Sequence, residues 1–118
     1  MSVIQATTPE LVFSIPADLT DKAVEIVLKQ RNRTMQFANE MVAFSNDRLR
    51  IVSGASSSTV YLALTQEETI SLCPGTCQIQ GRIMDSSGYV QAVDFGGGID
   101  VGAYLRPAVL TYGEEGSV

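Results

Sequence analysis

The stretch TVYLALTQEETISLCPGTCQIQGRIMDSSGYVQAVDF, residues 59–95, carries the clearest secondary-structure pattern in the chain. At its start, every second side chain is a large aliphatic one: Val60, Leu62 and Leu64. This period of two is typical of a β-strand that buries one face. We therefore predict a strand that ends at Leu64, with the rest of the chain adding sheet around it.

A short helical turn is predicted after this strand. Thr65 stands three residues before Glu68, which is the spacing of a capping box. In that motif the threonine hydroxyl accepts from the Glu68 amide while the Glu68 side chain reaches back. Pro74 and Gly75 then stop the helix and turn the chain, so the helix can only be short.

The end of the stretch is predicted to form a β-hairpin. Residues 77–83 alternate between small or apolar and polar side chains, and the turn sequence DSSG follows at residues 85–88. Cys77, Ile79, Gly81 and Ile83 are expected on the inner face. The expected register pairs Met84 with Tyr89, Ile83 with Val90, Gly81 with Ala92 and Arg82 with Gln91.

Shorter β-patterns on either side complete an all-β chain. Strands are predicted at residues 11–15, at 24–28, as two or three segments within 34–53, at 99–103 and at 108–112. The loop at residues 54–58 contains only small residues, and the glycine triplet at 96–98 predicts a bulge. About seven or eight short strands should therefore pack face to face as a single antiparallel β-sandwich.

The predicted domain organisation is one sandwich between two extended arms. The boundaries are an N-terminal arm at residues 1–8, the sandwich at 9–106 and a C-terminal arm at 107–118. The arms lack the alternation needed for the core, so neighbouring subunits are expected to hold them by backbone pairing and a few apolar side chains. Those side chains are Val3 and Ile4 at one end, and Val109, Leu110 and Tyr112 at the other.

Length and charge limit the classes of protein. At 118 residues the chain has room for one domain with a sizeable core. Its net charge is −5, and its eight basic residues are scattered except for Lys29, Arg31 and Arg33, so nucleic acid is not an expected partner. It contains no apolar run near the ~20 residues of a membrane helix and no signal-peptide pattern, so a soluble protein without a membrane partner is expected.

The residue types argue against catalysis. Without histidine, serine and cysteine nucleophiles lack their usual base. Glu67 and Glu68 are better explained as favourable charges at a helix N-terminus. Cys73 and Cys77 could close a small disulfide loop, but two small buried apolar side chains are the favoured interpretation, and the pair cannot supply a structural zinc site alone. We expect a non-enzymatic protein with no cofactor.

Four tyrosines are candidates for an interface. Aromatic side chains at sheet edges often anchor protein contacts. The alternative is ordinary packing between neighbouring strands. The four residues are Tyr61, Tyr89, Tyr104 and Tyr112.

Several segments of the chain resemble small Ig-like structural proteins of tailed bacteriophages, similar in pattern to the N-terminal domain of phage baseplate upper proteins. The similarity covers roughly residues 7–105. It is carried by TTP at 7–9 leading into LVF at 11–13, by VEIVL at 24–28, by LTQEET at 64–69 and by QIQGR at 78–82. The glycine triplet and the Cys73/Cys77 pair depart from that pattern.

This resemblance implies an Ig-like, non-enzymatic building block of the virion, made in the host cytoplasm. Its place would be the capsid, the head-to-tail connector, the tail or the baseplate, and its partners other virion proteins and copies of itself. A binding module for host surface carbohydrate is the alternative, because the loops and exposed aromatic side chains of Ig-like sandwiches can stack on sugars. The absence of tryptophan weakens that alternative.

Overall fold

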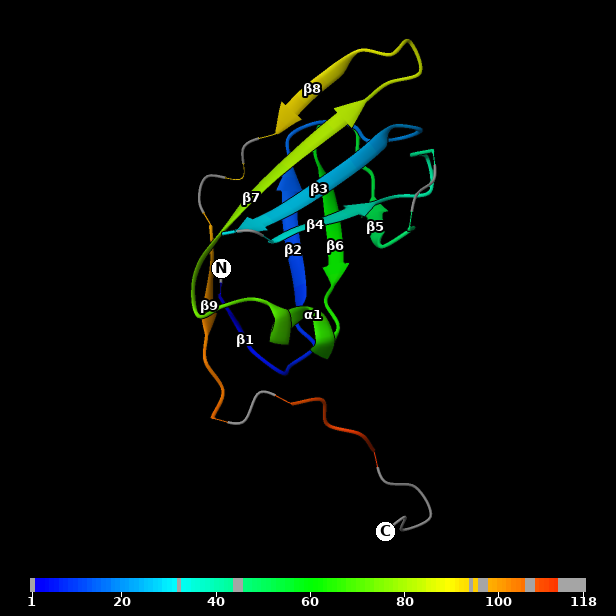
Figure 1. Cartoon of the computed structure of the whole chain (residues 1–118). Helices are drawn as coiled ribbons and strands as arrows, with labels where there is room; N and C mark the ends of the chain where they lie inside the picture. Colours follow the sequence, from blue (N-terminus) through cyan, green and yellow to red (C-terminus); the bar gives the residue numbers. More distant parts are fainter. Residues whose placement is uncertain are drawn as a thin grey trace.

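The computed structural model describes residues 2–31, 33–43, 46–93, 95, 98–105 and 108–112, which form nine strands and one helix. The strands are β1 Ser2–Ile4, β2 Glu10–Ile15, β3 Ala23–Gln30, β4 Arg33–Ala38, β5 Leu49–Val52, β6 Ser58–Ala63, β7 Gly75–Met84, β8 Val90–Val93 and β9 Ile99–Gly102. The helix α1 spans Gln66–Ser71, between β6 and β7 (Figure 1). The prediction of an all-β sandwich with a single short helix is confirmed.

The strands form two sheets. The larger has the order β1-β9-β7-β3-β4, with β8 also paired to β7, and the smaller has the order β2-β6-β5. If β2 to β7 are matched in chain order to strands B, C, C′, D, E and F of an immunoglobulin domain, the smaller sheet has the order B-E-D. The larger sheet then follows C′-C-F-G, with β8 and β9 sharing the last position. What the two sheets share with an immunoglobulin domain is the β-sandwich architecture, and β1 lies outside this matching.

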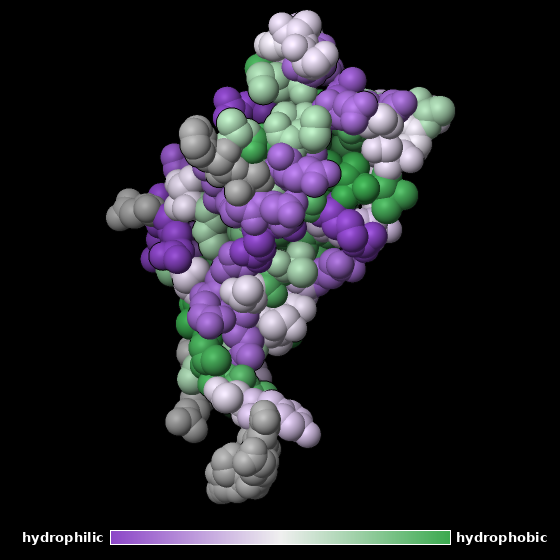
Figure 2. Space-filling model, turned by 90° about the vertical axis from the view of Figure 1, so that its right-hand side faces the viewer, coloured by the Kyte–Doolittle hydropathy of each residue, from purple (hydrophilic) through white to green (hydrophobic). Residues whose placement is uncertain are grey.

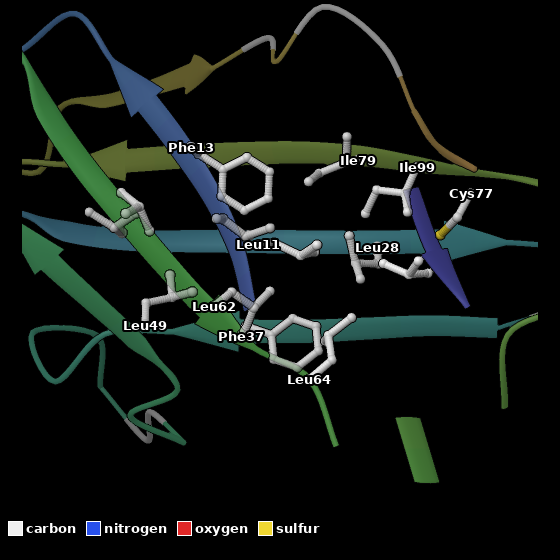
Figure 3. Packing of buried hydrophobic residues seen from close by; sticks show 14 of the residues in the cluster. Leu11, Phe13, Leu28, Phe37, Leu49, Leu62, Leu64, Cys77, Ile79 and Ile99 are labelled. Atoms are coloured by element: carbon white, nitrogen blue, oxygen red, sulfur yellow. The ribbon is translucent and has the colours of Figure 1, made fainter. Parts of the chain in front are cut away.

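The core lies between the two sheets and is built by alternation along each strand. On β2 the side chains of Leu11, Phe13 and Ile15 are buried, and their neighbours are exposed. Figure 3 shows Leu11 and Phe13 among the side chains of the larger sheet, with Phe13 near Ile79, and it shows Phe37 of β4 near Leu64. Each fully buried large aliphatic or aromatic side chain stabilises the fold by roughly 1.5–3 kcal/mol relative to its exposed state. The inward positions predicted on β6 and β7, and for Leu64 directly after β6, are confirmed, since Val60, Leu62, Leu64, Cys77, Ile79 and Ile83 are all buried.

The capping box at the start of α1 is also present. The Glu68 amide donates to the Thr65 hydroxyl at 3.2 Å, and the Thr65 amide donates to Glu68 Oε1 at 2.8 Å. The helix ends at Ser71, before the proline and glycine that the sequence marks as its stop. It is short, as predicted.

The predicted register of the β7–β8 hairpin is wrong by one residue. Met84 pairs with Val90 and Gly81 pairs with Val93. The reason lies in the turn: Asp85 N–H donates to the Tyr89 carbonyl at 3.1 Å, so Asp85 rather than Met84 faces Tyr89. Since side chains alternate with a period of two, this slip moves Val90 to the exposed face and turns Val93 inward.

The N-terminal arm is not separate from the sandwich. Residues 2–4 form β1, which pairs with β9 in parallel, a departure from the all-antiparallel expectation. Val3 is only 3% exposed and belongs to the core. The boundary at residue 8 is therefore wrong for this segment, because the edge of β9 offers backbone partners and the sandwich has room for the valine side chain.

Of the two or three strands predicted within residues 34–53, the described residues form two, β4 and β5, and residues 40–43 lie in turns. One further strand prediction needs correction. Residues 108–112 form no strand. The predicted bulge at residues 96–98 falls mainly on residues 96 and 97, which lie outside the described residues, but β8 and β9 pair with opposite ends of β7 on either side of it.

Candidate functional site

The chain beyond β9 leaves the sandwich. Residues 103–105 and 108–112, the C-terminal segment, extend away from the two sheets on the side of α1 (Figure 1). The radius of gyration is 15.9 Å, larger than the roughly 13.5 Å expected of a compact chain of this length. The C-terminal segment is thus an extension of the domain and not part of its core.

Large apolar side chains are concentrated on this extension. Leu110 is 80% exposed and Tyr112 is 89% exposed, and Tyr104, Leu105 and Val109 are exposed as well. Figure 2 shows hydrophobic residues at the lower end of the molecule, below a mainly hydrophilic middle. Exposed apolar side chains that gather in one region often mark an interaction site.

A glutamine holds the backbone of the C-terminal segment in place. Gln66 Nε2 donates to the Leu110 carbonyl at 2.9 Å, and the Leu110 N–H donates to Gln66 Oε1 at 2.6 Å. The carboxamide thus satisfies both backbone groups of one residue, as a neighbouring strand would. The contact orders the main chain while the Leu110 side chain stays exposed.

Two buried glutamines hold the loop between α1 and β7 in a similar way. The Gln30 carboxamide donates to the Cys73 carbonyl at 2.7 Å and accepts from the Cys73 N–H at 2.6 Å. Gln5 donates to the Leu72 carbonyl at 2.7 Å and accepts from the Tyr104 N–H at 3.4 Å. These contacts tie the loop to β3 and to the N-terminal segment.

A basic groove lies beside the Gln30–Cys73 contact. This hollow of about 560 Å³ is lined by Gln30, Arg31, Arg33, Thr34, Ser71 and Cys73. Arg31 and Arg33 are exposed, and Lys29 is exposed on the adjoining strand end. Within the described parts of the chain, no salt bridge links any of these three cations to a carboxylate.

The salt bridges that are present involve other basic residues. Arg48 binds Glu68 with hydrogen bonds of 2.8 and 2.6 Å, donates to the Ala63 carbonyl at 2.7 Å and lies over the Phe37 ring. Partial burial alone would raise the pKa of Glu68, but hydrogen bonds from Arg48 and Thr65 outweigh it and hold that pKa below its ordinary value. The bond to Glu68 raises the pKa of Arg48.

On the larger sheet, Glu25 is buried and paired across two strands. Arg82 Nε donates to Glu25 Oε1 at 2.8 Å, and the Gln36 carboxamide donates to the other carboxylate oxygen. Glu25 thereby links β3 to both of its neighbours, β7 and β4. We assign this cluster a structural role, because burying a carboxylate requires charged or hydrogen-bonding partners.

The predicted interface residues that are exposed or half-buried fall on four different parts of the described structure. Tyr104, Val109, Leu110 and Tyr112 lie together on the C-terminal segment, Tyr89 lies exposed at the β7–β8 turn and Ile4 lies exposed on β1. Tyr61 lies half-buried on the smaller sheet, where the Arg50 guanidinium covers its ring at 3.9 Å from the centroid. Val3 is buried in its own core and contributes no exposed surface.

The sequence analysis did not identify two features of the site. Gln66 has no sequence signal, because its partner is 44 residues away. The basic groove did have a sequence signal, because Lys29, Arg31 and Arg33 cluster within five positions. That cluster was used only to judge whether nucleic acid could bind.

The described residues contain no group of three or more histidine, cysteine, aspartate or glutamate side chains placed to hold a metal ion. Both cysteines are free, with Cys77 buried and Cys73 half-buried. Burial raises the pKa of the Cys77 thiol, which disfavours the reactive thiolate. Among the described residues, no helix is long enough to cross a membrane, since α1 has only 6 residues.

Comparison with protein-family models and with curated proteins gave no match to this chain.

Proposed function

We propose that this protein is a structural subunit of a bacteriophage particle, in the capsid, the connector, the tail or the baseplate. It acts through protein–protein contacts with other virion proteins and with copies of itself, and it needs no catalytic group. The resemblance in the sequence motivates the phage assignment. The exposed apolar side chains of the C-terminal segment support the mode of action.

The C-terminal segment has the features of a docking element. Its backbone is positioned by Gln66, so less conformational entropy is lost when a partner binds. Its exposed side chains include Leu110 and Tyr112, and tyrosine is enriched among the residues that dominate binding energy. A segment held in this way presents apolar anchors to a neighbour without weakening its own core.

Mass spectrometry of purified particles tests the proposal. The protein should be present in many copies in particles of the phage that encodes it. A chain lacking residues 106–118 should keep the β-sheet circular dichroism of the full chain but should be missing from particles. Absence of the full-length protein from particles, with the protein free in the lysate, would exclude a virion role.

The carbohydrate-binding alternative has less structural support. A sugar stacks on the open face of an aromatic ring, and Arg50 occupies one face of Tyr61. Tyr89 belongs to the hairpin of the other sheet, so the two rings do not share one sheet face. A glycan array with the Tyr61→Ala and Tyr89→Ala variants would show whether either ring binds sugar.

A further inference from the structure

The basic groove carries positive charge that no carboxylate of the described residues pairs with, although the protein as a whole is acidic. The chain has a net charge of −5, yet Arg31 and Arg33 both line this groove without an ion-pair partner in the described ranges. Like charges held close together repel each other, so an acidic partner is favoured at this place. The groove therefore has the charge of a receptor for a carboxylate-bearing segment.

The floor of the groove is already ordered. Gln30 is buried, and both polar atoms of its carboxamide are bonded to the Cys73 backbone. This contact fixes the start of the β3–β4 connection against the loop that follows α1. A partner would then dock on a preformed hollow, and little conformational entropy would be lost by ordering it.

The chain itself carries a segment of complementary charge. In the sequence the acidic pair Glu114–Glu115 follows Tyr112 after a single glycine. Leu110 and Tyr112, just before this pair, are exposed and have no place in the core of their own subunit. The C-terminal region thus combines apolar anchors with carboxylates.

The direction of the C-terminal segment favours a second copy over the same copy. Figure 1 shows the segment leading away from both sheets, and Leu110 and Tyr112 remain mostly exposed as far as the described chain goes. The groove and the segment are different surfaces, so copies can join head to tail, with each segment in the groove of the next copy. Repeated contacts of that kind build rings or filaments.

We propose that the C-terminal segment of one copy, with Glu114 and Glu115, docks in the basic groove formed by Arg31 and Arg33 of a second copy. This inference deepens the proposed function, on which it rests, by naming the partner and the charges that select it. The purified chain should then associate head to tail in solution without any other virion protein.

Sedimentation velocity of the full chain tests the inference. Association should rise with protein concentration at about 0.05 M salt and be lost near 1 M salt, where charges are screened within a few ångströms. Arg31→Glu/Arg33→Glu and Glu114→Lys/Glu115→Lys should each weaken self-association roughly tenfold to a hundredfold, because like charges then face each other. An equimolar mixture of the two double variants should associate again.

A matched control separates the groove from overall charge. Lys22→Glu/Arg50→Glu makes the same change in net charge elsewhere on the molecule and should associate less than threefold more weakly than the native chain, within about 0.6 kcal/mol. Circular dichroism would show that all variants are folded.

Four results would overturn the inference. They are a full chain that stays monomeric, self-association weakened as much by the control variant as by the groove variant, no association in the mixture of the two double variants, or a salt-sensitive change in sedimentation that does not depend on protein concentration. The last would place the segment in the groove of its own copy. Presence of the protein in particles despite any of these results would leave the proposed function standing, so the two can fail separately.

Discussion

Gly81 leaves the space that the ring of Phe95 fills. A Cβ built on Gly81 would lie 2.9 Å from Phe95 Cε2 and 3.2 Å from the Glu25 carbonyl oxygen, both closer than normal contacts. The Phe95 ring packs in turn on Phe13 of the opposite sheet, with ring centroids 4.8 Å apart. The interruption between β8 and β9 thus places an aromatic ring between the sheets, and this requires glycine on β7.

Gly81→Ala should therefore destabilise the protein although alanine suits a strand better than glycine. We expect a loss of about 1–3 kcal/mol in the free energy of unfolding, measured by urea titration, because the added methyl overpacks the site. Replacing Phe95 by leucine in the same chain should recover part of the loss. Ala92→Ser, exposed on the neighbouring strand, serves as control and should change stability by less than about 0.5 kcal/mol. A neutral Gly81→Ala would show that Phe95 does not occupy this space.

The Arg48–Glu68 pair should contribute stability that depends on pH. The pKa of Glu68 is lowered in the folded protein, so its contribution is present above the unfolded value of about 4.3 and is lost as the pH falls through the folded value. Arg48→Met should cost about 1–2 kcal/mol at pH 7. Its difference from the native chain should shrink below about pH 4. Urea midpoints at several pH values measure this difference.

The exposed Arg50–Glu10 pair is the matched control for that experiment. Its atoms are 4.0 Å apart, and both side chains are at least half exposed. Arg50→Met should change stability by under about 1 kcal/mol at either pH. If Arg48→Met shows the same loss at pH 3 as at pH 7, the stacking of Arg48 on Phe37 and its bond to Ala63 carry the effect, and the ion pair does not.

Loss of the helix cap should destabilise the protein less than loss of a core side chain in the same stretch. Thr65→Ala removes the acceptor for the Glu68 amide and should cost about 1 kcal/mol. Ile79→Ala empties a site that is 8% exposed between the sheets and should cost about 2–5 kcal/mol. Chemical denaturation of both variants checks the ranking. A near-neutral Ile79→Ala would contradict its inward position.

The two ends of the chain should respond differently to deletion. Removing residues 1–5 takes away β1, the buried Val3 and the Gln5 contact to Leu72, so stability should fall by several kcal/mol, on the order of one large core truncation. Removing residues 106–118 takes away the exposed Val109, Leu110 and Tyr112 and the Gln66 contact, so the unfolding midpoint should hardly move. Thermal unfolding followed by circular dichroism compares the two. Equal losses would mean that both ends belong to the sandwich.

The sequence by itself determined the features that depend on near neighbours. Alternation in residues 59–64 and 77–83 predicted β6, β7 and their buried faces, because side chains on a strand point alternately to its two faces. Thr65 and Glu68 predicted the start of α1, because a capping box involves residues three apart. A place outside the core was also predicted for Val109, Leu110 and Tyr112, because their segment lacks the alternation of a core strand.

Only the tertiary structure decided the features that join distant residues. The parallel pairing of β1 with β9 and the Gln66–Leu110 contact link residues that no local pattern relates. The register of the β7–β8 hairpin shows the same limit at short range. The sequence DSSG is compatible with pairing Met84 to Tyr89 or to Val90, and the choice between them decides which side chains of β8 face the core. Local sequence determines which side chains favour burial, but the space and the backbone partners they find exist only after the sheets have packed.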